Sequence, residues 1–115
     1  MSARIHGAVR GIGKTNIYVD DKRERLEIWV DEKEAEGLPY RYNTRVSINL
    51  FVGGTKYRGG LRSTPKTSFV WISPDLRDKN DQKVSLAKVL AENGFAKNDR
   101  VALIVNSEDV HLERE

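Results

Sequence analysis

Short segments in which apolar and polar residues alternate run along most of this chain, and they constrain the fold more than any other feature. The longest covers residues 41–52, where every second position from Val46 to Val52 is a valine, isoleucine or leucine. Alternation with a period of two is typical of β-strands that bury one face. Further segments with strand character are residues 4–9, 16–19, 25–30, 55–62, 68–73, 100–105 and 110–112. The sequence therefore predicts a mainly β protein.

Helix and turn signals between these segments are few. Gly53 and Gly54 separate two alternating segments and predict a β-hairpin. Ser85 precedes an apolar stripe with helical spacing and Gly94 follows it, so we expect one helix between them. The acidic residues 31–36 fit a second short helix or a solvated loop. This pattern favours a β-barrel or pseudobarrel with one or two short helices at its ends over a βαβ sheet.

The length of 115 residues is that of one domain, so we expect a single domain over residues 1–115. The chain has no cysteine and two histidines, which argues against disulfides and against a cysteine- or histidine-rich metal site. No segment approaches the run of about 18 apolar residues that a transmembrane helix needs, and the N-terminus lacks the pattern of a secretory signal. We expect an intracellular protein with no bound metal, no cofactor and no membrane partner.

Basic residues are unevenly distributed along the chain, although its net charge is only +3. Residues 1–19 contain three Lys or Arg and no acid, and residues 40–74 contain six and no acid. These two stretches together carry +9, which leaves −6 on the other 61 residues. Attraction of a polyanion depends on the local field rather than on the global balance. The segregation favours a nucleic-acid partner, with chance clustering or pairing to acidic loops as the alternative.

Residues 11–15, Gly-Ile-Gly-Lys-Thr, end like a nucleotide-binding phosphate loop. That motif needs a glycine five residues before Gly13, where Ala8 stands, and a helix after Thr15 whose amide groups hold the phosphates. Residues 16–19 have an extended pattern instead. We therefore interpret the segment as a basic, glycine-containing loop that can follow a nucleic-acid backbone closely.

Two patterns formally fit a nuclease metal site, in which one acid is followed later by an acid-x-Lys triplet. They are Asp20 with residues 31–33 and Asp78 with residues 81–83. Both triplets lie in polar, loop-like surroundings, whereas metal ligands need a rigid frame. Neither His6 nor His111 has the neighbours of a hydrolase triad. The chain by itself is therefore predicted to be a binding module and not an enzyme.

Residues 56–67, Lys-Tyr-Arg-Gly-Gly-Leu-Arg-Ser-Thr-Pro-Lys-Thr, are the strongest candidate for nucleic-acid contact. They contain four basic residues, three hydroxyl side chains after Leu61 and no acid. Arginine donates two parallel hydrogen bonds to guanine O6 and N7, and Lys, Ser and Thr suit phosphate oxygens. Gly59 and Gly60 would let the backbone approach a duplex. The alternative is a solvated hairpin with polar pairs between its strands.

A resemblance to a known family rests on two neighbouring runs of residues. Residues 57–64, Tyr-Arg-Gly-Gly-Leu-Arg-Ser-Thr, and 69–76, Phe-Val-Trp-Ile-Ser-Pro-Asp-Leu, look like the specificity domains of EcoRII-like type II restriction endonucleases. Residues 84–87 and 94–101 continue the similarity, which spans roughly residues 40–105. Those domains belong to the DNA-binding pseudobarrel group, together with the plant B-three transcription-factor domains.

The resemblance implies an open seven-stranded pseudobarrel with two short helices, whose concave sheet docks into the major groove of double-stranded DNA. Two recognition arms would grip the duplex, an N-arm over residues 10–16 and a C-arm over residues 58–67. These positions fall within the two acid-free stretches. The resemblance also implies that the chain is the N-terminal targeting or effector part of a larger restriction enzyme, located in the cytoplasm of a prokaryote.

The candidate DNA-binding side chains lie in these arms and on the strand before the C-arm. Arg10 and Arg62 are the candidates for reading bases, because arginine suits guanine edges best. The other candidates would hold phosphates or bases in register, or lie beside the concave face: Lys14, Thr15, Asn16, Lys56, Arg58, Ser63, Thr64, Lys66 and Thr67. No catalytic, cofactor-binding or metal-binding residue is predicted. The isolated domain is expected to be a monomer without a small-molecule substrate.

Two other functions would use the same basic stretches. A small barrel that binds RNA or another single strand would use Trp29, Phe51 and Tyr57 as stacking platforms. We expect instead that Tyr57, Phe69 and Trp71 pack in the core or on a sheet face. A structural or protein-interaction barrel would turn its basic face toward an acidic partner.

Overall fold

A computed structural model describes residues 3–15, 23–64 and 68–115 of the chain. Within these residues it contains nine β-strands, one α-helix and one short 3-10 helix. In chain order the elements are β1 (Ala3–Thr15), β2 (Glu24–Asp31), η1 (Ala35–Gly37), β3 (Val46–Val52), β4 (Thr55–Arg62), β5 (Phe69–Ile72), β6 (Asp75–Arg77), β7 (Lys83–Ser85), α1 (Leu86–Glu92), β8 (Arg100–Asn106) and β9 (Asp109–Arg114). The sequence patterns did not predict the short strands β6 and β7.

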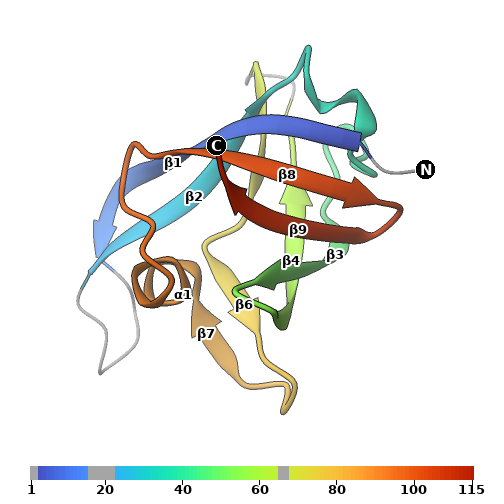
Figure 1. The fold of residues 1–115 in the computed structure, drawn as a ribbon. Coiled ribbons are helices and arrows are strands. Elements are labelled where there is room, and N and C mark those ends of the chain that lie inside the picture. Colours follow the sequence, from blue (N-terminus) through green and yellow to red (C-terminus); the bar gives the residue numbers. More distant parts are fainter. Residues whose placement is uncertain (1–2, 16–22, 65–67) are drawn as a thin grey trace.

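Seven of the strands form a closed barrel (Figure 1). Hydrogen-bonded neighbours follow the order β3-β9-β8-β1-β2-β5-β4, and β4 pairs with β3 to close the ring. The pairing of β3 with β9 is parallel, whereas the other pairings of the ring are antiparallel. β6 and β7 extend from β4 outside the ring. The prediction of a mainly β barrel with a short helix is confirmed, but the expected opening in the barrel is not.

The alternating segments bury the side that the sequence predicts. Ile48, Leu50 and Val52 on β3 are at most 1% exposed. Alternate apolar residues of β2, β5, β8 and β9 join them in one core cluster, because successive side chains of a strand point to opposite faces. Tyr57 of β4 is partly buried against this core. Phe69 and Trp71 of β5 belong to the opposite, outward side of their strand and are half-buried.

Helix α1 begins and ends at the residues that the sequence predicts. The Ser85 hydroxyl accepts a hydrogen bond from the Lys88 N–H at 3.0 Å and caps the first turn. Gly94, with φ of +81°, lets the chain leave the helix, and the Phe95 N–H donates to the Leu90 carbonyl at 2.9 Å. The helix packs against β2 and β7. Within the described residues no helix is long and apolar enough to cross a bilayer.

Residues 10–15 continue strand β1, so the prediction that they form a loop is wrong. Arg10 is opposite Glu27 of β2, and the register shifts between Gly11 and Thr15. Gly13 has a φ of +73° that suits such a bulge, and its N–H donates to Glu24 Oε2 at 2.9 Å. Lys97 Nζ lies 2.9 Å from Glu24 Oε1. The hydrogen bond from Lys97 lowers the pKa of the Glu24 carboxyl most, and the hydrogen bond from the Gly13 N–H lowers it further. Pairing with β2 thus replaces the expected loop.

Candidate nucleic-acid interface

The outward side chains of β1, β2, β5 and β4 form one continuous surface, here called the outer face. Side chains that neighbour each other across this face come from paired positions of adjacent strands. Ala8 is opposite Trp29, Trp29 is opposite Trp71, and Trp71 is opposite Arg62. Two hollows lie on this face, one on each side of the Trp29–Trp71 pair. We refer to them as the Arg62 hollow and the Arg10 hollow.

The Arg62 hollow contains the strongest base-reading candidate of the sequence together with two further arginines. Its lining residues are Arg25, Glu27, Arg45, Arg62, Thr64, Trp71, Ser73, Pro74 and Asp75. Arg25 Nη2 lies 2.6 Å from Asp75 Oδ2, so the charge of this arginine is neutralised locally. Within the described part of the chain, neither Arg45 nor Arg62 has a hydrogen-bonding or ion-pair partner. The hollow therefore presents two guanidinium groups that form no ion pair with a described residue, in the company of the Glu27 carboxylate.

A glycine on β4 determines where the side chain of Arg45 lies. Val46 is opposite Leu61, which brings Arg45, the residue before β3, next to Arg62 at the end of β4. A Cβ atom at Gly60 would lie 2.5 Å from Arg45 Nε and 2.7 Å from its Cζ. The Arg45 guanidinium thus occupies the space above β4 that any other residue at position 60 would fill. Sequence reasoning missed Arg45 because its position depends on this pairing of β3 with β4.

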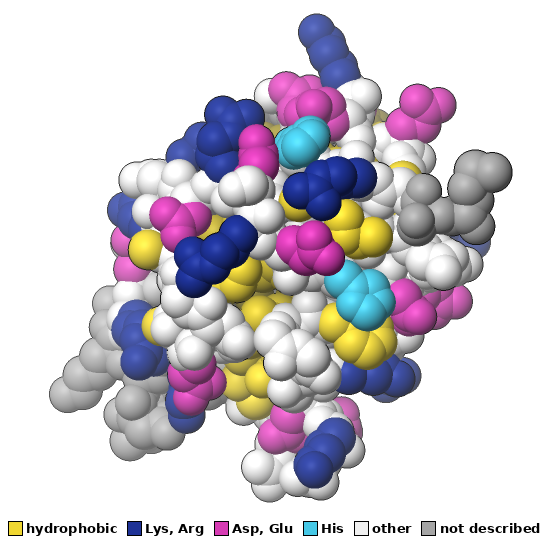
Figure 2. Space-filling model, in the orientation of Figure 1, with side chains coloured by type: hydrophobic (Ala, Val, Ile, Leu, Met, Phe, Trp, Pro, Cys, Tyr) yellow, Lys and Arg dark blue, Asp and Glu magenta, His cyan; other side chains and the backbone are white. Residues whose placement is uncertain are grey.

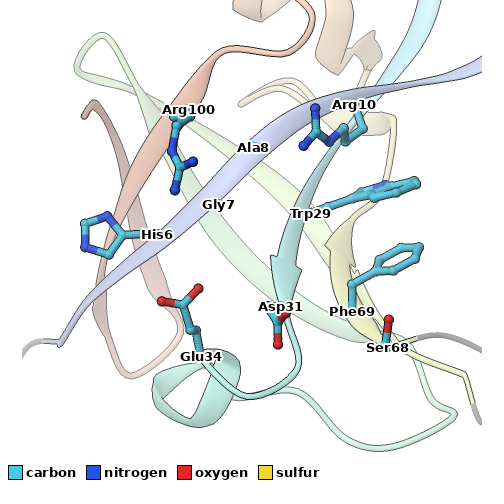
Figure 3. A pocket seen from close by; sticks show the side chains of 10 residues that line it. All are labelled: His6, Gly7, Ala8, Arg10, Trp29, Asp31, Glu34, Ser68, Phe69 and Arg100. Carbon is cyan, nitrogen blue, oxygen red and sulfur yellow. The ribbon is translucent and has the colours of Figure 1, made fainter.

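Three aromatic rings separate the two hollows. The Trp29 and Phe69 rings are stacked with centroids 3.9 Å apart, and Phe69 meets Trp71 at 5.6 Å in a tilted arrangement. Figure 3 shows the Trp29 and Phe69 rings one above the other, with Arg10 beside Trp29. Trp29 Nε1 donates to Glu27 Oε1 at 2.9 Å. Each of the two stacked rings covers one face of the other, which reduces the aromatic surface that could stack on bases.

The Arg10 hollow combines cations with carboxylates. Arg10 and Arg100 line it, and so do Asp31 and Glu34 near the end of β2 (Figure 3). Arg10 Nη1 donates to Asn98 Oδ1 at 3.0 Å, so its guanidinium is held at the mouth of the hollow. This hollow is less basic than the Arg62 hollow.

Most of the predicted N-arm, residues 10–16, belongs to β1; the end of β1 and the β4–β5 connection, here called the arm roots, lie at opposite ends of the outer face. β1 ends at Thr15, and β2 starts at Glu24 across the bulge. The far end of β2, Asp31, is opposite Phe69, which follows the β4–β5 connection. Because β2 has eight residues, its ends are about 23 Å apart. A major groove about 12 Å wide fits between them.

The predicted site residues do not all reach this face. Lys56 and Arg58 line another hollow at the far end of β4, together with Arg77, Asp78 and Asp81. Asn16, Lys66 and Thr67 lie outside the described residues, as do the side chains of Lys14 and Thr15, whose backbone ends β1. Arg62 and Thr64 line the Arg62 hollow, and Arg10 lines the other.

Ser63 has a structural position that the sequence did not predict. It is 6% exposed, and its hydroxyl accepts from the Asn43 N–H at 3.3 Å and faces the Arg41 carbonyl at 3.5 Å. These contacts hold the turn before β3 against the end of β4. The Ser63 hydroxyl is therefore engaged in this turn, and its contact with DNA stays a prediction.

The rings expected for a single-strand platform lie apart from one another. Phe51 is stacked on His111 of β9 with centroids 4.3 Å apart, whereas Trp29 is stacked on Phe69 of the outer face. Tyr57 points toward the core, and burial raises the pKa of its hydroxyl. No common surface joins these rings.

Besides Glu27 and Asp75 of the Arg62 hollow, further acidic side chains lie close to basic ones elsewhere on the surface. Figure 2 shows Lys and Arg interspersed with Asp and Glu on the side that carries β8 and β9. Ion pairs there include Arg4 with Glu113 at 3.5 Å and Arg100 with Glu115 at 3.6 Å. Asp31, the first acid of one acid-x-Lys triplet, accepts a hydrogen bond from the Lys33 N–H at its Oδ1, and Asp78, the acid that precedes the other triplet, accepts one from the Asn80 N–H at its Oδ1. Across the described ranges no three His, Asp or Glu side chains are grouped to hold a metal ion.

Comparison with protein-family models, with curated proteins and with solved structures found no match for this chain.

Proposed function

We propose that this chain is a B-three-like domain that binds double-stranded DNA in a sequence-specific manner. The outer face would enter the major groove, with the end of β1 and the β4–β5 connection on either side. By its resemblance to EcoRII-like enzymes, the domain would target a cytoplasmic type II restriction endonuclease to its site without itself carrying the catalytic groups. It would act as a monomer when isolated.

One observation carries this proposal: Arg45 and Arg62 lie side by side in the Arg62 hollow without an acidic partner among the described residues. Two neighbouring guanidinium groups repel each other, and an anionic or acceptor-rich ligand relieves that repulsion. Phosphate oxygens and the guanine O6 and N7 atoms both provide such acceptors. The hollow is thus suited to a duplex edge.

The arrangement of the aromatic rings favours a duplex over a single strand. Single-strand binding relies on aromatic faces that are free to stack on bases. Trp29 and Phe69 are stacked on each other instead. A basic hollow between two arm roots about 23 Å apart matches a double helix better.

A titration of labelled random-sequence duplex at increasing salt tests the proposal. We expect binding at about 50 mM salt that weakens steeply toward about 200 mM, because released counterions give a slope of about −0.9 per neutralised phosphate. An unlabelled duplex should compete better than the separated single strands. Preference for single strands would make the chain a single-strand-binding barrel. Absence of any binding at low salt would favour the protein-interaction barrel.

Gly60→Ala should weaken duplex binding several-fold while leaving the fold intact. The added methyl group would occupy the place of the Arg45 guanidinium, and this flexible side chain would move away. We expect the same loss in Arg45→Ala and no further loss in the double variant, because both changes remove one contact. Anisotropy titrations of the three variants measure this.

Gly59→Ala is the matched control for this experiment. It adds the same methyl group to the neighbouring residue, where the new Cβ would meet Leu76 Cδ2 of the core at 3.1 Å. It should therefore affect stability and not DNA binding. Equal binding by Gly60→Ala and the parent chain, in the presence of a clear loss in Arg45→Ala, would show that position 60 does not hold Arg45 in place.

A further inference from the structure

Of the two acids in the Arg62 hollow, Glu27 is the one without an ion pair among the described residues. Two carboxylates line this hollow, and Asp75 is paired with Arg25 at 2.6 Å. The other carboxylate, Glu27, has no ion pair with any described residue and accepts a hydrogen bond from Trp29 Nε1 at 2.9 Å. Partial burial raises the pKa of its carboxyl, and the Trp29 hydrogen bond and the nearby charge of Arg25 oppose that shift. Glu27 is thus a partly desolvated acceptor in a hollow that three arginines line.

The position of Glu27 is fixed by its surroundings. Its strand β2 is paired on both sides, with Arg10 of β1 opposite Glu27. The bond from Trp29 orients Oε1, and Trp29 is itself held by stacking on Phe69. A side chain that is oriented before binding loses little entropy when it meets a ligand. Such preorganisation suits a group that discriminates between ligands.

The chemistry of the major groove limits what a carboxylate can contact there. Phosphates repel it, so Glu27 is not suited to a backbone contact. Cytosine presents its N4 amino group as a donor in the groove, and carboxylates accept from it. Adenine also presents an amino group, but beside it the N7 acceptor would repel the second carboxylate oxygen. In the same G·C pair, guanine O6 and N7 are acceptors for an arginine such as Arg62.

We propose that Glu27 is a specificity-determining residue that accepts a hydrogen bond from the N4 amino group of a cytosine. Trp29 is the positioning residue that aims the carboxylate. This inference rests on the proposed binding of duplex DNA. It adds that the target site contains a G·C pair next to the Arg62 hollow, with its cytosine read by Glu27.

The inference is tested with duplexes selected from a random pool by the parent chain and by Glu27→Gln. The parent should prefer cytosine at one position by about fivefold to 150-fold, the range of a good base contact. Glu27→Gln should lose most of that preference and bind random duplex somewhat more tightly, because a negative charge has been removed. Glu92→Gln on α1 makes the same charge change away from the outer face and should behave like the parent. Trp29→Phe should keep the ring stacked and reduce the cytosine preference only in part.

A modified target tests the contact without changing the protein. N4-methylcytosine keeps its pairing with guanine and places a methyl group where the amino hydrogen faces the groove. We expect the parent to bind this duplex about fivefold or more weakly, and Glu27→Gln to be indifferent to the methyl group. The modified duplex also covers the case in which Glu27→Gln fails to fold.

The possible outcomes separate this inference from the proposed function. A parent chain that binds no duplex overturns the proposed function itself. A parent that selects a site, together with a Glu27→Gln variant whose cytosine preference is unchanged, overturns the role of Glu27 alone. Equal binding of the parent chain to the N4-methylcytosine duplex and to the unmodified duplex would also overturn the role of Glu27.

Discussion

Replacing Arg62 with alanine is expected to weaken binding of the preferred duplex by about 1–3 kcal/mol and to leave binding of random duplex nearly unchanged. The expected difference arises because a base contact is made only on the correct sequence, whereas phosphate contacts are made on any sequence. Arg62 is exposed at the end of β4, and no described residue neutralises it. Parallel titrations of the two duplexes measure both losses.

Arg58→Ala is the matched control on the same strand. Arg58 is also exposed, but it lies in the separate hollow with Arg77, Asp78 and Asp81. We expect Arg58→Ala to lose less binding free energy on the preferred duplex than Arg62→Ala. Equal weakening of preferred and random duplex by Arg62→Ala would make Arg62 a backbone contact instead of a base-reading residue.

Replacing Leu50 with alanine should lower the free energy of unfolding by about 2–5 kcal/mol, the usual cost of a large cavity in a core. Leu50 is fully buried and lies at the seam that closes the barrel, opposite Tyr57 of β4 and Val110 of β9. The cavity would loosen the contacts of three strands at once. Urea unfolding followed by circular dichroism measures the loss.

Ser47→Ala on the same strand is the control for this prediction. Its side chain is exposed on the outer side of β3, so the change should stay within about 0.5 kcal/mol. If Leu50→Ala cost no more than Ser47→Ala, the closure of the barrel through β3 would be contradicted.

Local signals in the sequence predicted the helix and the longer strands, but not β6, β7 or the continuation of β1 through residues 10–15. The alternation in residues 46–52 depends only on one buried face, and the Gly53-Gly54 turn has the positive φ values, 57° and 81°, that a tight hairpin needs. The Ser85 cap and Gly94 likewise act within a few residues of their position. The parallel pairing of β3 with β9 joins residues about 60 positions apart, and no local pattern contains that information.

The candidate site likewise contains residues that the local sequence predicted and residues that depend on strand pairing. Arg62 and Thr64 were predicted because they lie in an acid-free stretch with suitable chemistry, and the fold brings them to the Arg62 hollow. Arg45 and Glu27 were missed, since they reach that hollow only through the pairings of β3 with β4 and of β2 with β5. The sequence alone did not predict that Ser63 is buried. Its hydroxyl, which would suit a phosphate, accepts a hydrogen bond from the backbone of a turn.

Selection of bound duplexes from a random-sequence pool examines DNA binding, strandedness and base specificity together. We expect the parent chain to enrich one short duplex site containing a G·C pair, and the Arg45→Ala, Arg62→Ala double variant to enrich none. The Arg58→Ala variant should enrich the same site as the parent. Recovery of unselected sequences by the parent chain, or enrichment of the same site by the double variant, would contradict the claim that the outer face reads duplex DNA.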